Sequence, residues 1–166
     1  MKVGVLSDSH QKIQELKTTL DFLVKNGAEF IVHAGDVCRY EALELLASCG
    51  LKYVVVYGNN DAPLVQHHND YNLVQEPYYF KLANTKFKLM HLPFYMNPDA
   101  EIVISGHTHQ FHCEFKDNTL FLNPGEVCAR EKPIKECVML YIENEKFEVE
   151  YFANYEKAKT FSFLRD

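Results

Sequence analysis

Side chains that can bind a divalent metal occur at five places in the sequence, and each place follows a short apolar run. Carboxylates, imidazoles and a carboxamide supply the oxygen and nitrogen ligands that such ions accept. About seven ligands suffice for two ions that share one bridge, and two ions about 3.5–4 Å apart can stabilise the attacking and leaving oxygens of a phosphoryl transfer. The candidate ligands are Asp8, His10, Asp36, Asn59, His91, His107 and His109.

Each of these signals is weak by itself. A single Asp or Asn after a strand is more often a turn former or a helix cap than a ligand. The pair His107 and His109 indicates more, because alternation along an extended chain points both rings to the same side. Two surface histidines would give the same pattern. The combination is more specific, since independent turn formers have no reason to supply metal ligands at five consecutive sheet edges.

Apolar periodicity predicts the elements that would position these side chains. Three short apolar runs are typical of buried strands: residues 2–6, 30–32 and 53–57. Residues 12–25 and 40–49 lie between them and have the three- and four-residue spacing of amphipathic helices. Repeated strand, polar turn and helix indicate an α/β fold with parallel strands. Ligands of such sheets bind at the carboxyl ends of the strands, where the first candidates lie.

From residue 78 onward the pattern changes to shorter strands separated by polar turns. Residues 78–82 and 87–90 are expected to form a hairpin. Further strands are expected at residues 102–105, 112–115, 120–122, 137–142 and 147–152. Pro93 and Pro98 make a helix improbable over residues 92–101. We therefore expect two sheets packed face to face with helices outside, in a single domain over residues 1–166.

Composition excludes several classes of protein. The 166 residues favour one domain, and a hydrophobic fraction of 47% excludes disorder. Seventeen Lys and Arg against 23 Asp and Glu give a net charge of −6, which argues against a long nucleic acid as partner. No apolar stretch approaches the ~20 residues that span a bilayer. The five cysteines include no Cys-x-x-Cys pair, so we expect reduced thiols, a cytoplasmic location and no membrane partner.

In order and spacing, the candidate ligands resemble the motifs of the calcineurin-like metallophosphoesterases, and specifically of their small single-domain bacterial and archaeal phosphodiesterase branch. The resemblance runs from about residue 1 to 130. The matching segments are Ser7-Asp8-Ser9-His10, Ala34-Gly35-Asp36-Val37, Gly58-Asn59-Asn60-Asp61, Met90-His91, Gly106-His107-Thr108-His109 and Asn123-Pro124-Gly125. The resemblance implies a four-layer α/β/β/α sandwich of two mixed sheets.

The resemblance also implies how the ligands divide between two metals. Asp8, His10 and His109 would hold one ion, Asn59, His91 and His107 the other, and Asp36 would bridge them. The branch favours Mn²⁺, although the same ligands accept Fe²⁺, Zn²⁺ or Ni²⁺. A hydroxide between the metals would attack phosphorus, with His107 or Asn60 steadying a phosphate oxygen.

Asp61 has two interpretations, which are compatible with each other. The resemblance implies that it supports the ligands from behind. It would also suit the N-cap of a helix that begins near Pro63. His33, at the end of the second strand, is expected either in the core or behind the ligands. Asn123 and Arg130 are candidate substrate contacts.

Two positions depart from the family pattern. Members usually have His or Cys at the position of Asn60, and a His there can protonate the leaving oxygen. An amide donates a hydrogen bond but is no acid at neutral pH, so we expect a dependence on leaving groups that need little protonation. Leu92-Pro93 follows His91 where the family usually has Gly, and relatives often carry a helix there. Residues 94–96 would then form part of an open rim, or they pack in the ordinary way.

The leading function is metal-dependent hydrolysis of a small phosphodiester. A phosphomonoesterase or dinucleotide hydrolase stays open, because only the pocket walls would separate these activities. A non-catalytic interaction scaffold also stays open, since the superfamily includes a small retromer subunit that works chiefly in this way with a degraded metal site. Here every expected ligand is present. A homo-oligomer, either a dimer or a tetramer, is left open.

Overall fold

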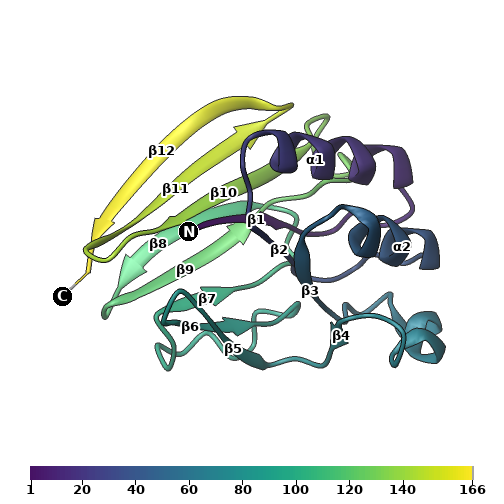
Figure 1. The fold of residues 1–166 in the computed structure, drawn as a ribbon, viewed down its shortest axis with the longest axis horizontal. Coiled ribbons are helices and arrows are strands. Elements are labelled where there is room, and N and C mark those ends of the chain that lie inside the picture. The colour runs from purple at the N-terminus through teal and green to yellow at the C-terminus, as the bar shows by residue number, and fades with distance from the viewer. Residues whose placement is uncertain (166) are drawn as a thin grey trace.

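The computed structural model describes residues 1–165 and contains two β-sheets with helices on one side (Figure 1). The first half of the chain forms β1 (Lys2–Leu6), α1 (Ile13–Lys25), β2 (Phe30–His33), α2 (Tyr40–Ser48), β3 (Lys52–Val56), the 3₁₀-helix η1 (Ala62–His67) and β4 (Leu73–Val74). The second half forms β5 (Tyr78–Leu82), β6 (Thr85–Leu89), β7 (Ile102–Ile104), β8 (Phe111–Lys116), β9 (Thr119–Pro124), β10 (Glu136–Ile142), β11 (Lys146–Ala153) and β12 (Glu156–Leu164).

Both sheets are mixed. The seven-stranded sheet has the order β12-β11-β10-β1-β2-β3-β4, and its strands β1 to β4 are parallel, as the sequence predicts for the first three of them. The five-stranded sheet has the order β5-β6-β7-β9-β8, with parallel pairing only at β6-β7 and β7-β9. In each sheet the parallel strands end at the same edge, so the loops that follow them can converge.

The main core lies between the two sheets. Alternation along β1 sends Val3 and Val5 into this core and Leu6 toward the helices. The five-stranded sheet contributes Phe87 and Ile104 from the other side, and all four named core residues are fully buried. Burial of this kind stabilises a fold by about 25 cal/mol per Å² of apolar surface. The sandwich therefore holds the ligand-bearing loops on a rigid base.

Helices α1 and α2 cover the outer face of the seven-stranded sheet. The three- and four-residue spacing of Leu16, Leu20 and Leu23 buries one side of α1, and the helix ends before Asn26-Gly27, as predicted. The helix packs closely because Gly4 has no side chain. A Cβ at that position would lie 3.0 Å from Cδ1 of Leu23, which is on α1.

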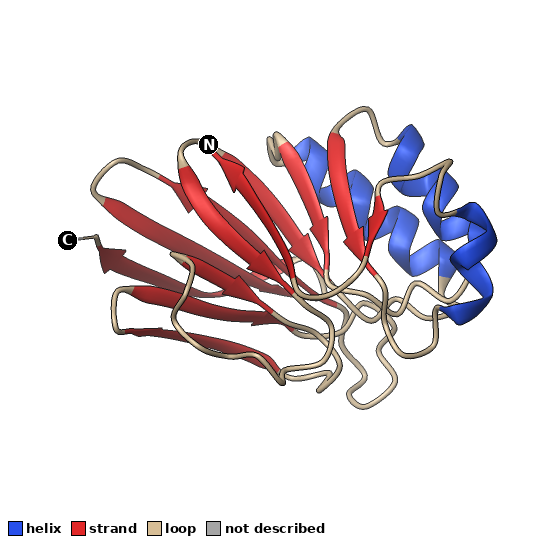
Figure 2. Ribbon diagram, turned by 90° about the horizontal axis from the view of Figure 1, so that it is seen from below, coloured by secondary structure: helices blue, strands red, loops and turns tan. Residues whose placement is uncertain are grey.

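The fold class and the two mixed sheets are confirmed, but the four-layer arrangement needs a correction. Within the described residues, no helix covers the outer face of the five-stranded sheet, and Figure 2 shows the helices gathered on one side of the strands. The irregular segment 92–101 lies there instead, and Met96 packs against a small cluster that includes Val103 and Phe121. The two prolines of this segment explain why it is not helical. The sandwich thus has three layers.

Three local expectations also change. Strand β6 begins at Thr85 rather than Phe87, because Ala83 and Asn84 both adopt positive φ angles, 47° and 63°, and close a two-residue turn. The predicted helix near Pro63 is the short 3₁₀-helix η1. Strand β12 has no clear apolar alternation over its first five exposed residues, so the sequence did not indicate it. None of the helices in the described part of the chain is both long and apolar enough to cross a membrane.

Candidate metal centre

Loops from both sheets bring the seven candidate ligands into one cluster. Asp8 and His10 follow β1, and Asp36 and Asn59 lie in the loops after β2 and β3. His91 follows β6, while His107 and His109 lie in the loop after β7. Two sets of short distances occur in the cluster, which we call the His10 group and the Asn59 group, while Asp36 lies close to both and Asp8 is also near His91.

The His10 group contains Asp8, His10 and His109. The two Nε2 atoms lie 3.3 Å apart, and Oδ1 of Asp8 is 3.3 Å from Nε2 of His109 and 3.8 Å from Nε2 of His10. Ligands at about 2.1 Å from one ion stand about 3.0–3.4 Å apart in octahedral or tetrahedral geometry. The spacing of this group therefore fits a single ion with little adjustment.

Asp8 supplies an independent test of whether a cation fits. Its Oδ2 accepts hydrogen bonds from Oγ of Ser7 at 2.6 Å and from the backbone N–H of His107 at 3.0 Å. Its Oδ1 is buried and has no hydrogen-bond donor among the described residues. Burial raises the pKa of Asp8 above its usual value. An unpartnered carboxylate oxygen is costly in such a place, and a cation would relieve that cost.

The Asn59 group contains Asn59, His91 and His107. Oδ1 of Asn59 lies 3.0 Å from Nε2 of His91 and 3.0 Å from Nδ1 of His107. Oδ2 of Asp36 lies 3.5 Å from His91 Nε2 and 3.7 Å from His10 Nε2. One oxygen of Asp36 thus faces both groups. Burial raises the pKa of Asp36, but hydrogen bonds from Asn60 and the nearby His91 outweigh it and hold that pKa below its usual value.

The backbone at the ligands is strained. Positive φ angles occur at Asp8 (53°), His10 (45°), Asp36 (59°), His107 (67°) and His109 (59°). Such angles are uncommon outside glycine, cost on the order of 1 kcal/mol or more each, and often occur at functional sites. In two of the loops the positive φ angles occur two residues apart, at Asp8 and His10 and at His107 and His109, so that both side chains of each pair point into the cluster.

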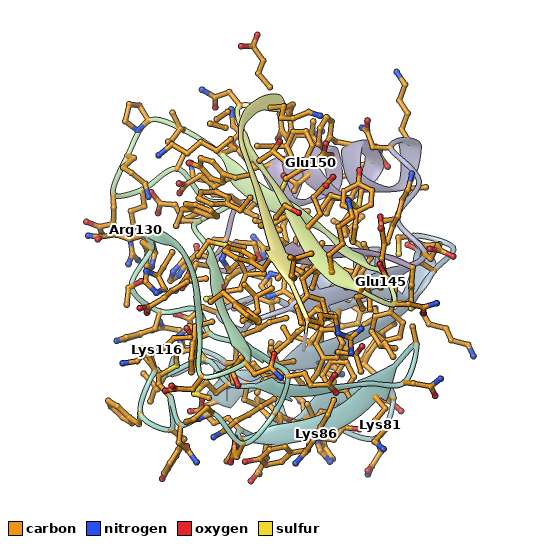
Figure 3. The ribbon with its side chains drawn as sticks, turned by 90° about the vertical axis from the view of Figure 1, so that its left-hand side faces the viewer. Lys81, Lys86, Lys116, Arg130, Glu145 and Glu150 are labelled. Carbon is orange, nitrogen blue, oxygen red and sulfur yellow. The ribbon has the colours of Figure 1, made fainter. Side chains whose placement is uncertain are left out.

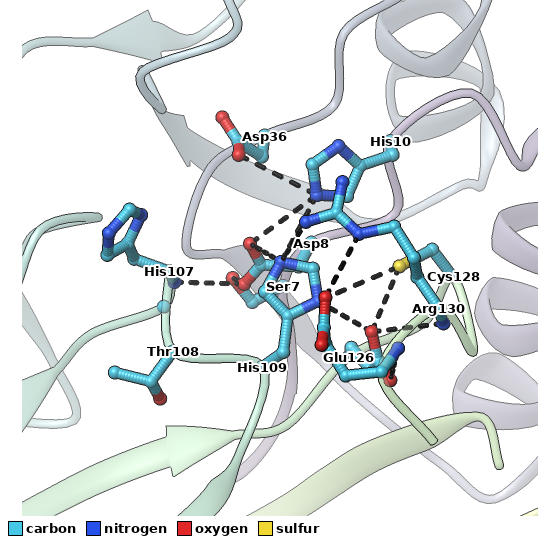
Figure 4. A network of polar contacts seen from close by, with 12 residues as sticks. Ser7, Asp8, His10, Asp36, His107, Thr108, His109, Glu126, Cys128 and Arg130 are labelled. Carbon is cyan, nitrogen blue, oxygen red and sulfur yellow. Dashed lines mark hydrogen bonds and ion pairs between the residues drawn. The ribbon is translucent and has the colours of Figure 1, made fainter. Parts of the chain in front are cut away.

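Hydrogen bonds behind the imidazoles fix which nitrogen faces the ligands. Nδ1 of His91 donates to the carbonyl oxygen of Ala34 at 2.7 Å, and Nδ1 of His109 donates to Oε2 of Glu126 at 2.5 Å. In the neutral form of each ring, the nitrogen without a proton is then Nε2, and this is the form that binds a metal. Figure 4 shows the carboxylate of Glu126 behind His109.

Sequence reasoning missed Glu126. Its side chain is fully buried, and it also accepts backbone N–H groups of Arg130, Glu131 and Lys132. Burial raises its pKa, but the hydrogen bonds, first of all that from His109, lower the pKa to about 2. The only signal was its place after Asn123-Pro124-Gly125, which by itself indicates a turn.

Asn60 and Asp61 contact the ligand loops in different ways. Nδ2 of Asn60 donates to Oδ2 of Asp36 at 2.7 Å, and its backbone N–H donates to Oδ1 at 2.9 Å. Asp61 is buried and accepts backbone N–H groups of Asp36, Cys38 and Gly58 at 2.7–2.8 Å. Asp61 stands at the predicted N-cap position of η1, but its carboxylate forms no cap hydrogen bond with that helix.

Three further residues named in the sequence analysis, His33, Asn123 and Arg130, lie in different surroundings. His33 is a buried core residue whose Nε2 lies 3.0 Å from Oγ of Ser9, and burial lowers its pKa to about 3. Asn123 donates to the carbonyl oxygen of Gly106 and so holds the loop of the paired histidines. Arg130 lies beside the His10 group, with Nη2 3.3 Å from Nε2 of His109.

Of the three residues proposed for an open rim, two are exposed and one is packed against the five-stranded sheet. Phe94 and Tyr95 are exposed, with 74% and 55% of their surface accessible. Met96 instead contributes to the outer cluster on the five-stranded sheet. Ordinary packing therefore holds for Met96.

The family model of the calcineurin-like phosphoesterase superfamily domain matches residues 1–145. Phosphodiesterase MJ0936 of Methanocaldococcus jannaschii is 25% identical over 142 residues, which cover 78% of this chain and 86% of that protein. Probable metallophosphoesterase MJ0623 of the same organism is 30% identical over 160 residues, covering 87% of this chain and 77% of the other.

Two solved structures share the fold. A novel archaeal phosphodiesterase has a TM-score of 0.80 and 23% identity, and the match covers 92% of this chain and 99% of the other. Vacuolar protein sorting 29 from Cryptosporidium parvum has a TM-score of 0.73 and 18% identity over 98% of this chain and 95% of its own. At these identities the likeness concerns the fold alone.

Proposed function

This chain belongs to the calcineurin-like phosphoesterase superfamily, and on that basis we propose that it is a metal-dependent phosphodiesterase that hydrolyses a small phosphodiester with two divalent metals. One observation carries the proposal: a single oxygen of Asp36 faces both ligand groups, at 3.7 Å from His10 and 3.5 Å from His91. The buried, unpartnered oxygen of Asp8 supports it. The curated relative named as a phosphodiesterase supports the choice of substrate class.

In this proposal the two groups hold one ion each and Asp36 holds both. The donor set of carboxylate, carboxamide and imidazole suits Mn²⁺, Fe²⁺, Zn²⁺ or Ni²⁺, among which we propose Mn²⁺. When bound, such ions lower the pKa of a shared water and neutralise charge on the phosphate. Glu126 keeps Nε2 of His109 free of a proton, and Asn60 orients the carboxylate of Asp36.

Residues on the open side would contact the substrate. His107 is exposed beside the Asn59 group, and Asn60 is exposed beside Asp36, between the two groups, so either could donate a hydrogen bond to a phosphate oxygen. Arg130 lies beside the His10 group, and a guanidinium is well suited to bind a phosphate through two hydrogen bonds. Asp61 would act through the backbone by holding the Asp36 loop.

The remaining expectations about the protein stay proposals. We propose a single domain, a cytoplasmic location and a small substrate rather than a long nucleic acid, with a dimer or a tetramer left open. All five cysteines lie in the described residues and are unpaired, which is consistent with a reducing compartment. A phosphomonoesterase or dinucleotide hydrolase remains the alternative activity.

A non-catalytic scaffold is the second candidate, because the fold is shared with vacuolar protein sorting 29. The test is to strip the protein of metal, restore Mn²⁺, and assay bis(p-nitrophenyl) phosphate against p-nitrophenyl phosphate. We expect Mn²⁺-dependent turnover that favours the diester. Asp36→Asn should reduce it to the metal-free level, while Asp21→Asn, which changes an exposed carboxylate on α1, should not.

Two outcomes would contradict the proposal. Absence of Mn²⁺-dependent turnover on both esters would favour the scaffold. Turnover that survives in Asp36→Asn would show that this carboxylate does not bridge the two groups.

A further inference from the structure

A cavity of about 490 Å³ opens beside Asn59, at one end of the ligand cluster. Its apolar lining comes from Tyr57, Ala62, Val65 and Leu92. This volume lies in the range of small-molecule sites, which are usually apolar with a few polar groups. Because Asn59 belongs to both the cavity wall and the ligand cluster, a group that enters the cavity can remain attached to a phosphorus atom at the cluster.

The wall of this cavity is unsuited to a second negative charge. Among the described residues that line it there is no Lys or Arg, and Glu76 supplies a carboxylate. Oε2 of Glu76 accepts the backbone N–H groups of His91 at 2.6 Å and Leu92 at 2.9 Å, so the acid is fixed in place. A second phosphate would meet this charge without a compensating cation. The cavity therefore favours an uncharged group.

Two features of the wall favour an aromatic group. The ring of Tyr57 is stacked on His68, with centroids 6.0 Å apart and an interplanar angle of 14°, which limits its motion. Val65 leaves 62% of its surface exposed, so apolar area is available to cover. A flat ring can contact both, and aromatic side chains are the usual platforms for nucleobases and other rings.

The opposite end of the cluster has the opposite character. A cavity of about 410 Å³ there is lined by His10, Lys12 and Arg130, among others. The guanidinium of Arg130 lies against His109 in Figure 4, and Figure 3 shows Arg130 at the edge of the molecule. An oxygen that gains negative charge as it leaves phosphorus is stabilised by such cations.

We propose that the cavity beside Asn59, which we call the Tyr57 cavity, binds the uncharged aromatic ester group that stays on phosphorus, while the leaving oxygen lies on the Arg130 side. The proposal rests on the proposed function and deepens it. In the reaction a water oxygen bonds to phosphorus and the bond to the leaving oxygen breaks. That oxygen departs with the electron pair, a proton of the water passes to solvent, and the departing oxygen takes up a proton from solvent. The products are an aryl or nucleoside monophosphate and the released alcohol or phenol.

Three diesters with one leaving group test this assignment. Ethyl, phenyl and thymidine-5′ p-nitrophenyl phosphates all release p-nitrophenolate and differ only in the group that stays. The Mn²⁺-loaded wild type should prefer the phenyl and thymidine esters over the ethyl ester by about tenfold in kcat/KM, a usual value for apolar contacts in a pocket. A preference for phenyl alone would identify aryl esters as the substrates, and a preference for thymidine alone would identify nucleoside esters.

Two variants of the wall should reduce this preference. Val65→Ser and Tyr57→Leu should each lower the ratio of aromatic to ethyl kcat/KM by about threefold or more, mainly through KM. Val24→Ser makes the same change at a valine on α1 that is 36% exposed, and it should keep the wild-type ratio.

The outcomes separate this inference from the proposed function. Equal kcat/KM on all three diesters in the wild type, or a wild-type ratio in both wall variants, would overturn the assignment of the Tyr57 cavity and leave the phosphodiesterase intact. No turnover of any diester would refute the phosphodiesterase itself.

Discussion

Replacing Glu126 by Gln removes the charge behind His109 with almost no change in shape. Oε2 of Glu126 accepts from Nδ1 of His109 at 2.5 Å and from the backbone N–H of Arg130 at 3.1 Å. Oε1 accepts from the backbone N–H groups of Glu131 at 2.8 Å and Lys132 at 2.9 Å. Every one of these partners is a donor. A glutamine has one acceptor oxygen, so its NH₂ group must meet donors in either orientation.

The two orientations have different consequences. If the nitrogen replaces Oε1, two partly buried N–H groups lose their acceptor, at a cost of about 1 kcal/mol for each. If it replaces Oε2, His109 must carry its proton on Nε2, the atom that faces Asp8 and His10, and it can no longer bind a metal. Loss of such a partner usually lowers metal affinity 10–100-fold, or about 1.4–2.8 kcal/mol.

The assay is a calorimetric titration of the metal-free protein with Mn²⁺, after circular dichroism has shown that the variant is folded. Glu126→Gln should weaken the binding of one ion 10–100-fold relative to the wild type. Glu131→Gln is the matched control, because this exposed acid lies on the same loop and its side chain forms an ion pair with Arg130 at 3.4 Å rather than a hydrogen bond with His109. Equal Mn²⁺ affinity in the two variants would refute a role for Glu126 in fixing the tautomer of His109.

Two further predictions concern proton transfer and pH. Asn60→His should raise the rate on an alkyl diester by about 10²–10⁴-fold and change an aryl diester little, because only the alkoxide needs a proton to leave; equal alkyl rates in mutant and wild type would contradict this. Burial lowers the pKa of His33 from 6.5 to about 3. Between these pH values the unfolded chain therefore binds one proton more at this residue than the folded chain does. The free energy of unfolding is thus highest above pH 6.5 and falls as the pH is lowered. In urea unfolding with a chelator present, the free energy of unfolding of the wild type should fall by about 2 kcal/mol between pH 7 and pH 5 because of this residue. In His33→Gln this part of the decrease should be absent. The same pH dependence in both proteins would show that His33 is not held neutral.

The sequence predicted the strand-end positions of the candidate ligands because each has a local signal. An apolar run that ends in Asp, Asn or His shows both the strand and the residue at its end. Glu126 has no such signal, since it contacts His109 across 17 residues of sequence. The missing helical layer is similar. The prolines in residues 92–101 exclude a helix, but the packing of Met96 on the five-stranded sheet depends on contacts distant in sequence.

Buried acids that are not ligands explain how the strained loops keep their shape. Asp36 and Cys38 both have φ angles of 59°, and the carboxylate of Asp61 accepts the backbone N–H of each. Glu126 does the same for the loop that contains Ala129, whose φ angle is 52°. Glu76, which is only half-buried, accepts the backbone N–H of His91 in the same way.

These acids change the meaning of the net charge of −6. A buried carboxylate that accepts several backbone N–H groups offsets the cost of positive φ angles by fixing the groups on either side. Asp61 and Glu126 are therefore bound to backbone inside the protein, and they do not form an acidic surface that repels a phosphate. The N–H groups that these acids accept lie in the loops that carry the candidate ligands. Substituting one of the acids should therefore change the orientation of the ligand side chains more than the packing of the two-sheet core.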